Sequence, residues 1–277
     1  MPVHALALVL LSAAIHAGWN AIVKGATHRL LIAWWSLIII GVVGLPYVIV
    51  QGGIASALWL RLGASALAEA AYFWALVRAY DRGDFAVVYP VARGSAPALV
   101  TLGATLFLGD RIALLGGIGV AFVVAGILTI GGIRRERYGD VARALLVSVM
   151  IATYSVIDAS AARMTSPVPY VIVVFLCTGV LLAPALVWRY RASLWSIGWN
   201  ERRSIAVVSL GQLLGYSLVL MAFGMAPVAY VGALREISVV LAVAIAWRWL
   251  GERPTRHTIA GALLVVVGAV CVALVRG

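Results

Sequence analysis

Two arginines lie inside long apolar stretches of the sequence. They are Arg93 and Arg235. An ionisable side chain at membrane depth is costly unless it faces the protein interior, so each arginine is a candidate for function. A guanidinium group can bind a carboxylate or a phosphate through two parallel hydrogen bonds. The pair therefore predicts a binding site for an anionic or zwitterionic small molecule.

Three carboxylic acids lie equally deep in apolar segments. They are Glu69, Asp158 and Glu236. A buried carboxyl group beside an arginine can exist in protonated and ionised forms, so these acids are candidates for proton coupling. The alternative is that each acid forms a static ion pair with an internal arginine, and the sequence leaves both readings open.

Other polar and aromatic side chains recur in the same segments at helical spacing. His16, Trp19 and Asn20 fall at positions i, i+3 and i+4, so they share one face of a helix. Aromatic rings can stack on a ligand or bind a cation, although packing is the default role of each. Tyr230 is a further candidate for an aromatic wall. The predicted substrate-binding residues are His16, Trp19, Asn20, Tyr72, Tyr89, Arg93, Tyr154, Gln212, Tyr216 and Arg235.

The elements that carry these residues are predicted to be membrane-spanning helices. The chain has 277 residues, of which 64% are hydrophobic and 11% are charged, and its mean hydropathy is +1.07. This composition excludes a soluble globular protein, in which about a quarter of the residues are charged. A spanning helix takes about 20 apolar residues, which predicts an all-α membrane protein with about ten spans. We expect them at 3–23, 30–50, 57–78, 85–107, 112–132, 141–162, 168–188, 204–224, 228–249 and 256–275.

A long internal repeat relates the two halves of the chain. Residues 72–131 align without a gap on residues 214–273. The alignment pairs Arg93 with Arg235, Leu108, Gly109 and Asp110 with Leu250, Gly251 and Glu252, Gly119 with Gly261, and Gly126 with Gly268. Glycines seven residues apart share a helix face and allow close helix packing. A repeat of this size in a membrane chain is typical of a transporter whose two halves surround a central site.

The basic residues indicate how the spans are oriented. Most of the 21 Lys and Arg residues follow the odd-numbered spans, whereas the opposite side holds only Arg61, Arg111, Arg163 and Arg276. The positive-inside rule therefore places the odd-numbered loops in the cytoplasm and both termini outside. With five spans in each half, the two halves enter the membrane in opposite senses. Pro97 and Pro227 are expected to kink or end helices beside the central site.

The repeated block resembles the EamA domain of the drug/metabolite transporter superfamily. Leu108, Gly109 and Asp110, and Leu250, Gly251 and Glu252, stand where that family usually has Leu-Gly-Glu. The resemblance covers nearly the whole chain as two EamA repeats, residues 5–132 and 142–275. It implies ten transmembrane helices arranged as two inverted five-helix repeats, with a central cavity lined by spans 1, 3, 4, 6, 8 and 9. The family has many substrates, so the resemblance does not imply one.

These features predict a multi-pass protein of the cell (inner) membrane that transports a small metabolite by alternating access. The alternatives are a lipid-phosphate flippase, which would use the same arginines for the headgroup, and a broad-specificity drug or metabolite exporter. The sequence contains no P-loop and no motif of an intramembrane protease, so we expect no enzyme activity, no catalytic residue, no cofactor and no metal. The expected partners are a small-molecule substrate, the lipid bilayer and, as a candidate coupling ion, the proton. Nucleic acid is not expected, because the basic residues form no patch with interleaved aromatics. Both a monomer and a homodimer remain open.

Overall fold

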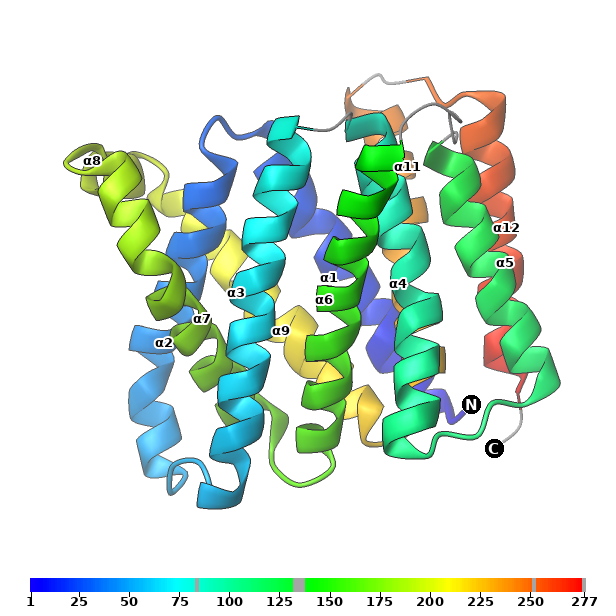
Figure 1. Ribbon diagram of the computed structural model, residues 1–277, viewed down its shortest axis with the longest axis horizontal. Helices are drawn as coiled ribbons and strands as arrows, with labels where there is room; N and C mark the ends of the chain where they lie inside the picture. Colours follow the sequence, from blue (N-terminus) through cyan, green and yellow to red (C-terminus); the bar gives the residue numbers. More distant parts are fainter. Residues whose placement is uncertain (83–84, 132–137, 251–252, 276–277) are drawn as a thin grey trace.

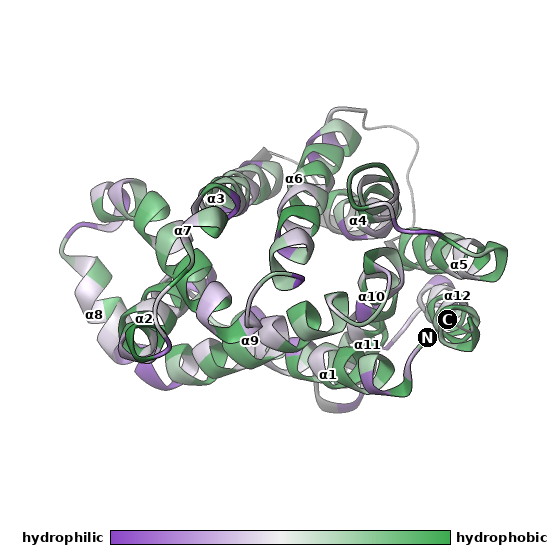
Figure 2. Cartoon of the chain, turned by 90° about the horizontal axis from the view of Figure 1, so that it is seen from below, coloured by the Kyte–Doolittle hydropathy of each residue, from purple (hydrophilic) through white to green (hydrophobic). Residues whose placement is uncertain are grey.

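The computed structural model describes residues 1–82, 85–131, 138–250 and 253–275. Within these residues every regular element is a helix, and the long helices lie side by side as one bundle (Figure 1). The bilayer core offers the backbone no hydrogen-bond partners, so a spanning segment must satisfy its own N–H and C=O groups within a helix. Hydrophobic residues accordingly cover most of each long helix (Figure 2).

The spans of the first half are five helices. They are α1 (Val3–Gly25), α2 (Arg29–Val50), α3 (Trp59–Arg82), α4 (Phe85–Leu108) and α5 (Leu114–Gly131), with a short 3-10 turn, η1 (Ser56–Leu58), before α3. The second half contains α6 (Tyr138–Ala162), α7 (Pro167–Tyr190), α8 (Ser193–Asn200), α9 (Arg202–Phe223), α10 (Val228–Arg235), α11 (Ile237–Leu250) and α12 (Arg256–Leu274). In the described chain nine segments are long and apolar enough to cross a membrane, and α5 is a shorter apolar helix. The predicted all-α membrane fold is confirmed, whereas the short helix α8 was not predicted.

Two equivalent helices, α5 and α12, pack against each other in opposite directions. A Cβ atom added at Gly119 would lie 2.7 Å from the carbonyl oxygen of Gly268, and one added at Gly126 would lie 2.6 Å from that of Gly261. The sequence repeat pairs Gly119 with Gly261, so the contacts cross over, as they must when equivalent helices run antiparallel. The close packing predicted from the glycine spacing is therefore confirmed, and this pair of helices has the geometry of an inverted repeat.

Both ends of the chain lie at the same end of the bundle. The N-terminal amino group of Met1 donates a hydrogen bond to the carbonyl oxygen of Val275, and Figure 1 shows the two termini together at the lower edge. An even number of crossings requires this arrangement. We call this the termini face, and the opposite end of the bundle the loop face.

The ninth span is interrupted, which the sequence analysis did not predict. The span expected over 228–249 is present as Val228–Arg248, but it consists of two helices, because α10 ends at Arg235 and α11 begins at Ile237. At the break, the Glu236 N–H donates to the Ala233 carbonyl at 3.1 Å, and the Glu236 carbonyl accepts from the Val239 N–H at 2.9 Å. These i to i+3 bonds replace the regular helical pattern. The equivalent helix α4 continues without a break past Arg93.

The prolines have different effects from those expected. Pro227 directly precedes the first residue of α10, so it marks a helix start and not a helix end. Pro97 lies inside α4, and its carbonyl accepts a hydrogen bond from the Thr101 hydroxyl at 2.7 Å. The break in the second half therefore has no proline at its centre, and the proline in the middle of α4 does not divide that helix.

The α5–α12 packing yields a test that uses two glycines of one helix. We expect Gly119→Ala to lower the thermal stability of the purified protein, because the added methyl group meets the backbone of α12; overpacking of this kind costs about 1 to 3 kcal/mol. Gly117→Ala is the matched control, since a Cβ atom there would meet only Ile112, at 3.8 Å. Melting in detergent, followed by tryptophan fluorescence, measures both. Equal melting temperatures for the two variants would contradict the assigned packing.

Candidate functional site

The acids identified in the sequence all face the interior of the bundle. The side chains of Glu69 on α3, Asp158 on α6 and Glu236 at the α10–α11 break belong to residues that are 7%, 0% and 5% exposed. Such burial matches the expectation that ionisable groups at membrane depth avoid the lipid. The charged residues therefore form a central cluster, which also includes Arg93 and Arg235.

An ion pair joins the two halves of the chain in this cluster. Arg93 Nη2 on α4 lies 3.1 Å from Glu236 Oε2, and the two side chains are 17% and 7% exposed. Glu236 thus forms an ion pair with an internal arginine, which was one of the two alternatives that the sequence left open for the acids. The partner comes from the other half of the chain and directly follows Arg235, the repeat equivalent of Arg93.

Arg235 has a different environment from Arg93. Its guanidinium carbon lies 5.6 Å from the centre of the Tyr216 ring, and its Nε atom is buried without a hydrogen-bond partner. No carboxylate of the described residues lies within ion-pair distance of it, although its charge acts on Glu69 and on His16. The positive charge of Arg235 is therefore balanced only at a distance, which leaves its hydrogen-bonding groups available to a ligand.

Asp158 is held by two tyrosine hydroxyls and not by an arginine. Tyr170 on α7 donates to Asp158 Oδ1 at 2.9 Å, and Tyr216 on α9 donates to Asp158 Oδ2. The Tyr216 ring also stacks on Phe175, with ring centres 5.5 Å apart. Tyr216 therefore connects the acid on α6 to the guanidinium group at the helix break, because its hydroxyl contacts Asp158 while its ring faces Arg235.

Glu69 has a single hydroxyl partner among the contacts described. The Thr178 hydroxyl on α7 donates to Glu69 Oε2 at 2.9 Å. Glu69 and Asp158 are near enough for their charges to interact. Within the described residues neither acid forms an ion pair with an arginine, so the static pairing considered from the sequence is seen for Glu236 and not for these two acids.

Three tyrosines line up across the cluster. The ring centres of Tyr72 and Tyr154 are 6.0 Å apart, and those of Tyr154 and Tyr216 are 6.5 Å apart, both with edge-to-face geometry. The row runs from α3 through α6 to α9. Tyr89 belongs to α4, but its side chain lies outside the described part of the chain.

The predicted stripe on α1 faces α9. The rings of His16 and Trp19 contact each other with centres 4.8 Å apart, and the Asn20 amide donates to the His16 carbonyl at 2.8 Å. Trp19 Nε1 and Gln212 Oε1 are both buried without a hydrogen-bond partner. Buried polar atoms nearly always have a partner, so this donor and this acceptor are positions where a ligand or water can bind.

The inward-facing polar residues come from the same spans that the family resemblance implied as the lining of a central cavity. His16, Glu69, Arg93, Asp158, Gln212 and Arg235 come from spans 1, 3, 4, 6, 8 and 9 in that order. Span 7 adds Tyr170 and Thr178, which the sequence analysis missed. No sequence signal singled them out, because a Thr hydroxyl in an apolar helix usually bonds to its own backbone and a Tyr ring is by default a packing residue.

The termini face is tied together by contacts between the two halves. Asp110, between α4 and α5, accepts from the Val228 N–H at the start of α10 at 2.6 Å and pairs with Arg163 at 2.7 Å. Tyr230 lies here and not with the central tyrosines, because its hydroxyl accepts from the Ala113 N–H at 2.8 Å. Asp110 thus caps a helix of the other half; its repeat equivalent Glu252 lies outside the described residues.

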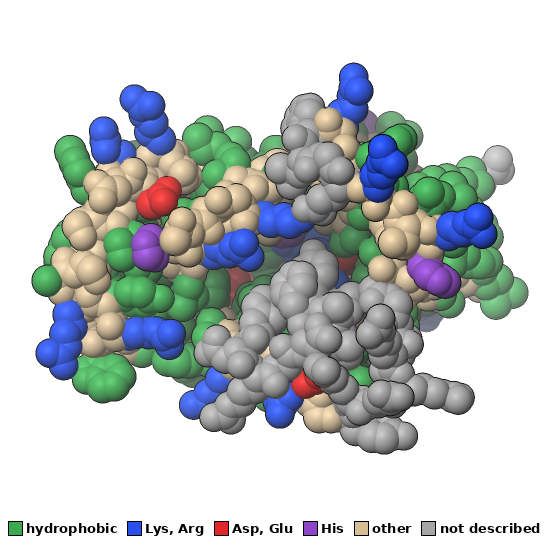
Figure 3. Space-filling model, turned by 90° about the horizontal axis from the view of Figure 1, so that it is seen from above, with side chains coloured by type: hydrophobic (Ala, Val, Ile, Leu, Met, Phe, Trp, Pro, Cys, Tyr) green, Lys and Arg blue, Asp and Glu red, His purple; other side chains and the backbone are tan. Residues whose placement is uncertain are grey.

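The loop face is more open. In space-filling view it is hollowed near its centre, where acidic and basic side chains are visible (Figure 3). The two faces therefore differ, because contacts between the halves join the termini face whereas the visible part of the loop face is hollowed.

The contrast between the two arginines can be tested by stability measurements. We expect Arg93→Gln to destabilise the protein strongly, because it leaves Glu236 as an unpaired buried charge, at a cost of about 3 to 5 kcal/mol. The double variant Arg93→Gln with Glu236→Gln should recover much of that loss, while Arg235→Gln alone should change the melting temperature little. Melting of these three purified variants and of Glu236→Gln alone decides this. The ion pair would not have the proposed role if the double variant were as unstable as the sum of the singles.

Comparisons with known proteins agree with this architecture. Residues 141–274 match the EamA-like transporter family. Over 70 residues the chain is 41% identical to a protein of Sinorhizobium sp named "Uncharacterized transporter in cobO 3'region"; the match covers 25% of this chain and 49% of that protein, so it spans about half of the relative's length.

A solved structure supports the fold over the whole length. A crystal structure described only as that of a protein superposes with a TM-score of 0.75 and 21% sequence identity, covering 98% of this chain and 97% of the other. At this identity the likeness shows the fold alone. The family match, however, agrees with the resemblance drawn from the sequence for the second half of the chain, which contains Leu250, Gly251 and Glu252. Residues 141–274, just under half of the chain, are therefore similar to the EamA-like transporter family, and the long apolar helices of the described residues are those of a multi-pass membrane protein.

Proposed function

We propose that the chain is a secondary active transporter that moves a small anionic or zwitterionic metabolite across the cytoplasmic membrane by alternating access. The observation that carries this proposal is Arg235, a partly buried arginine at a helix break, whose Nε atom is buried without a hydrogen-bond partner and which has no carboxylate partner among the described residues. Interrupted helices at mid-membrane are where transporters of this kind bind their substrates. The equivalent Arg93 is already neutralised by Glu236 and has a supporting role.

The surroundings of Arg235 favour an anionic group on the substrate. Arg235 is the last residue of α10 and α11 begins two residues later, so the negative end of one helix dipole and the positive end of the next largely offset each other there, and the preference for an anion rests on the guanidinium charge. A carboxylate or phosphate could accept two parallel hydrogen bonds from Arg235 while resting beside the Tyr216 ring. Trp19 Nε1 and Gln212 Oε1 are available to further polar groups of the same molecule.

Glu69 and Asp158 supply the opposite charge. Each is held only by hydroxyl groups, so a proton or a substrate amine can bind without first displacing an arginine. We assign these two acids to proton coupling or to the cationic end of a zwitterion, and Glu236 to the ion pair with Arg93. The two roles differ in one respect, because only proton coupling makes transport respond to a pH gradient.

Alternating access is supported by the unequal ends of the bundle. The bonds of Asp110 to Val228 and Arg163, and of Tyr230 to Ala113, close the termini face, while the loop face is hollowed (Figure 3). By the positive-inside rule the loop face is cytoplasmic, so we assign the structure to an inward-open state. Opening to the other side would break these contacts between the halves.

The role of Arg235 is tested by substitution in proteoliposomes. We expect Arg235→Gln to lower the affinity for an anionic substrate about tenfold or more, because each charge-assisted hydrogen bond contributes about 1.5 to 3 kcal/mol. A thermal-shift screen of amino acids, organophosphates and phosphonates identifies the substrate, and uptake of that compound measures the effect. Arg203→Gln, an exposed arginine of α9, is the control. Normal transport by well-expressed Arg235→Gln would exclude the binding role.

Proton coupling predicts a distinct behaviour of the acid variants. In liposomes without a substrate gradient, we expect the unmodified protein to accumulate substrate when a pH gradient is imposed. Glu69→Gln or Asp158→Asn should lose this response. Both variants should still exchange labelled for unlabelled substrate. Glu201→Gln, at the end of α8, is the control acid. An unmodified protein that is indifferent to the pH gradient would remove the coupling assignment and leave the zwitterion assignment standing.

A further inference from the structure

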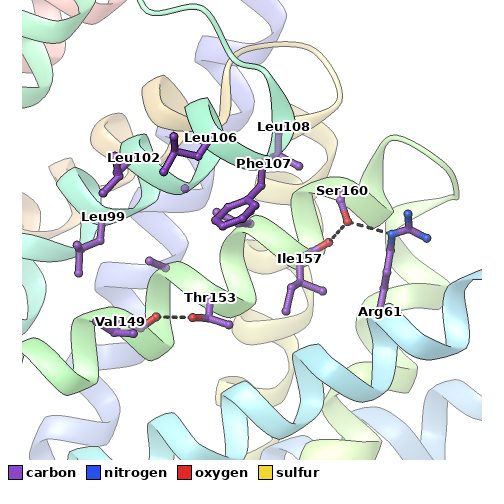
Figure 4. A pocket seen from close by; sticks show the side chains of 13 residues that line it. Arg61, Leu99, Leu102, Leu106, Phe107, Leu108, Val149, Thr153, Ile157 and Ser160 are labelled. Carbon is purple, nitrogen blue, oxygen red and sulfur yellow. Dashed lines mark hydrogen bonds between the residues drawn. The ribbon is translucent and has the colours of Figure 1, made fainter.

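A second binding region lies on the side of the bundle, between α4 and α6. It is a groove of about 670 Å³ (Figure 4). Its walls are apolar along most of their length, and Leu102, Leu106 and Phe107 on α4 are 55%, 67% and 79% exposed. Because exposed side chains at this depth of a membrane protein face hydrocarbon, the groove opens toward the lipid. None of the residues that line it belongs to the central cluster.

The groove has the length of one bilayer leaflet. Along α4 it extends from Leu99 to Leu108, and the nine steps between these residues span about 14 Å at the helical rise of about 1.5 Å per residue. The hydrocarbon core of a bilayer is about 30 Å thick, so half of it is about 15 Å. Leu108 is the last residue of α4, at the termini face. The groove therefore runs from the membrane surface on that side to about the middle of the bilayer.

A basic residue stands at the surface end of the groove. Arg61, near the start of α3, donates from Nε to the Ser160 hydroxyl at 3.2 Å and from Nη1 to the Ala57 carbonyl at 3.3 Å (Figure 4). These bonds hold the guanidinium group in place without neutralising it. No carboxylate of the described residues pairs with it, whereas Arg163 on the same face is paired with Asp110 at 2.7 Å.

The position of Arg61 also needs an explanation from topology. The termini face carries few of the 21 basic residues, so the bias that places arginines in cytoplasmic loops does not account for this one. A fixed positive charge at the end of an apolar groove one leaflet long is complementary to a molecule with an anionic head and a hydrocarbon tail. The bilayer itself supplies such molecules.

We propose that this groove binds one acyl chain of an anionic phospholipid from the leaflet at the termini face, with the lipid phosphate on Arg61. The chain lies along Leu102, Leu106 and Val149, and the phosphate accepts hydrogen bonds from the guanidinium nitrogens that Ser160 and Ala57 leave available. Helices α4 and α6 also carry Arg93 and Asp158, so the bound lipid sits between two helices of the transport site without contacting the substrate.

The experiment measures lipid binding to the purified full chain in a neutral detergent by native mass spectrometry. Phosphatidylglycerol is the anionic probe, phosphatidylcholine is the probe with no net charge, and inorganic phosphate is the headgroup without a chain. We expect one phosphatidylglycerol to bind more tightly than phosphatidylcholine, and phosphate alone not to bind. Arg61→Gln should weaken phosphatidylglycerol binding about fivefold, the effect of one basic side chain at a membrane surface, and leave phosphatidylcholine nearly unchanged.

A second variant tests the groove itself. Thr153→Phe places a ring in the groove and should reduce the binding of both lipids. The control is Leu146→Phe, at an exposed position two turns earlier on α6 that does not line the groove. This control should bind both lipids as the unmodified protein does. Arg111→Gln, an exposed arginine at the same face, controls for general charge. If Arg61→Gln and Thr153→Phe, each melting normally without lipid, bind phosphatidylglycerol as tightly as their controls, the lipid is adventitious only and the proposal is wrong.

Discussion

The hydrocarbon core of the bilayer offers polar groups no hydrogen-bond partners, and this constraint decides where the charged side chains of the membrane-spanning helices can lie. The backbone meets it by forming helices within each span. Glu69, Asp158 and Glu236 meet it by turning inward, where hydroxyl groups and Arg93 provide partners. A few buried polar atoms, such as Trp19 Nε1 and Gln212 Oε1, have no hydrogen-bond partner, and a bound substrate could supply one.

The duplicated sequence does not produce two equal half-sites. Arg93 lies in an unbroken helix and is neutralised by Glu236, whereas Arg235 lies at a break and contacts the face of Tyr216. A two-fold axis through a binding site would present the substrate with two identical ends. The observed asymmetry suits a molecule whose ends differ, because one arginine organises the site while the other remains available to a ligand.

The same helices connect the centre of the molecule to its surface. Helices α5 and α12 pack closely through their glycines and so join the two halves of the chain. The bonds of Asp110 to Val228 and Arg163 join the two halves at the termini face. Helices α4 and α6 carry central charges on one side and the lateral groove on the other. A change in the packing of these helices would therefore reach the central site, the closed face and the lipid contact together.

Composition and hydropathy in this sequence determined the membrane class, the approximate spans and which ionisable residues face inward, because each follows from the cost of polarity in lipid. The repeated block carried the resemblance to the EamA family. The glycine spacing likewise predicted the close packing of α5 and α12. Only the tertiary structure decided which charges meet. The ion pair of Arg93 with Glu236 joins residues of different helices, and so do the hydrogen bonds from Tyr170 and Tyr216 to Asp158. The break at Glu236 has no glycine or proline at its centre from which it could have been predicted. These features depend on how helices pack in three dimensions, which no local pattern in the chain records.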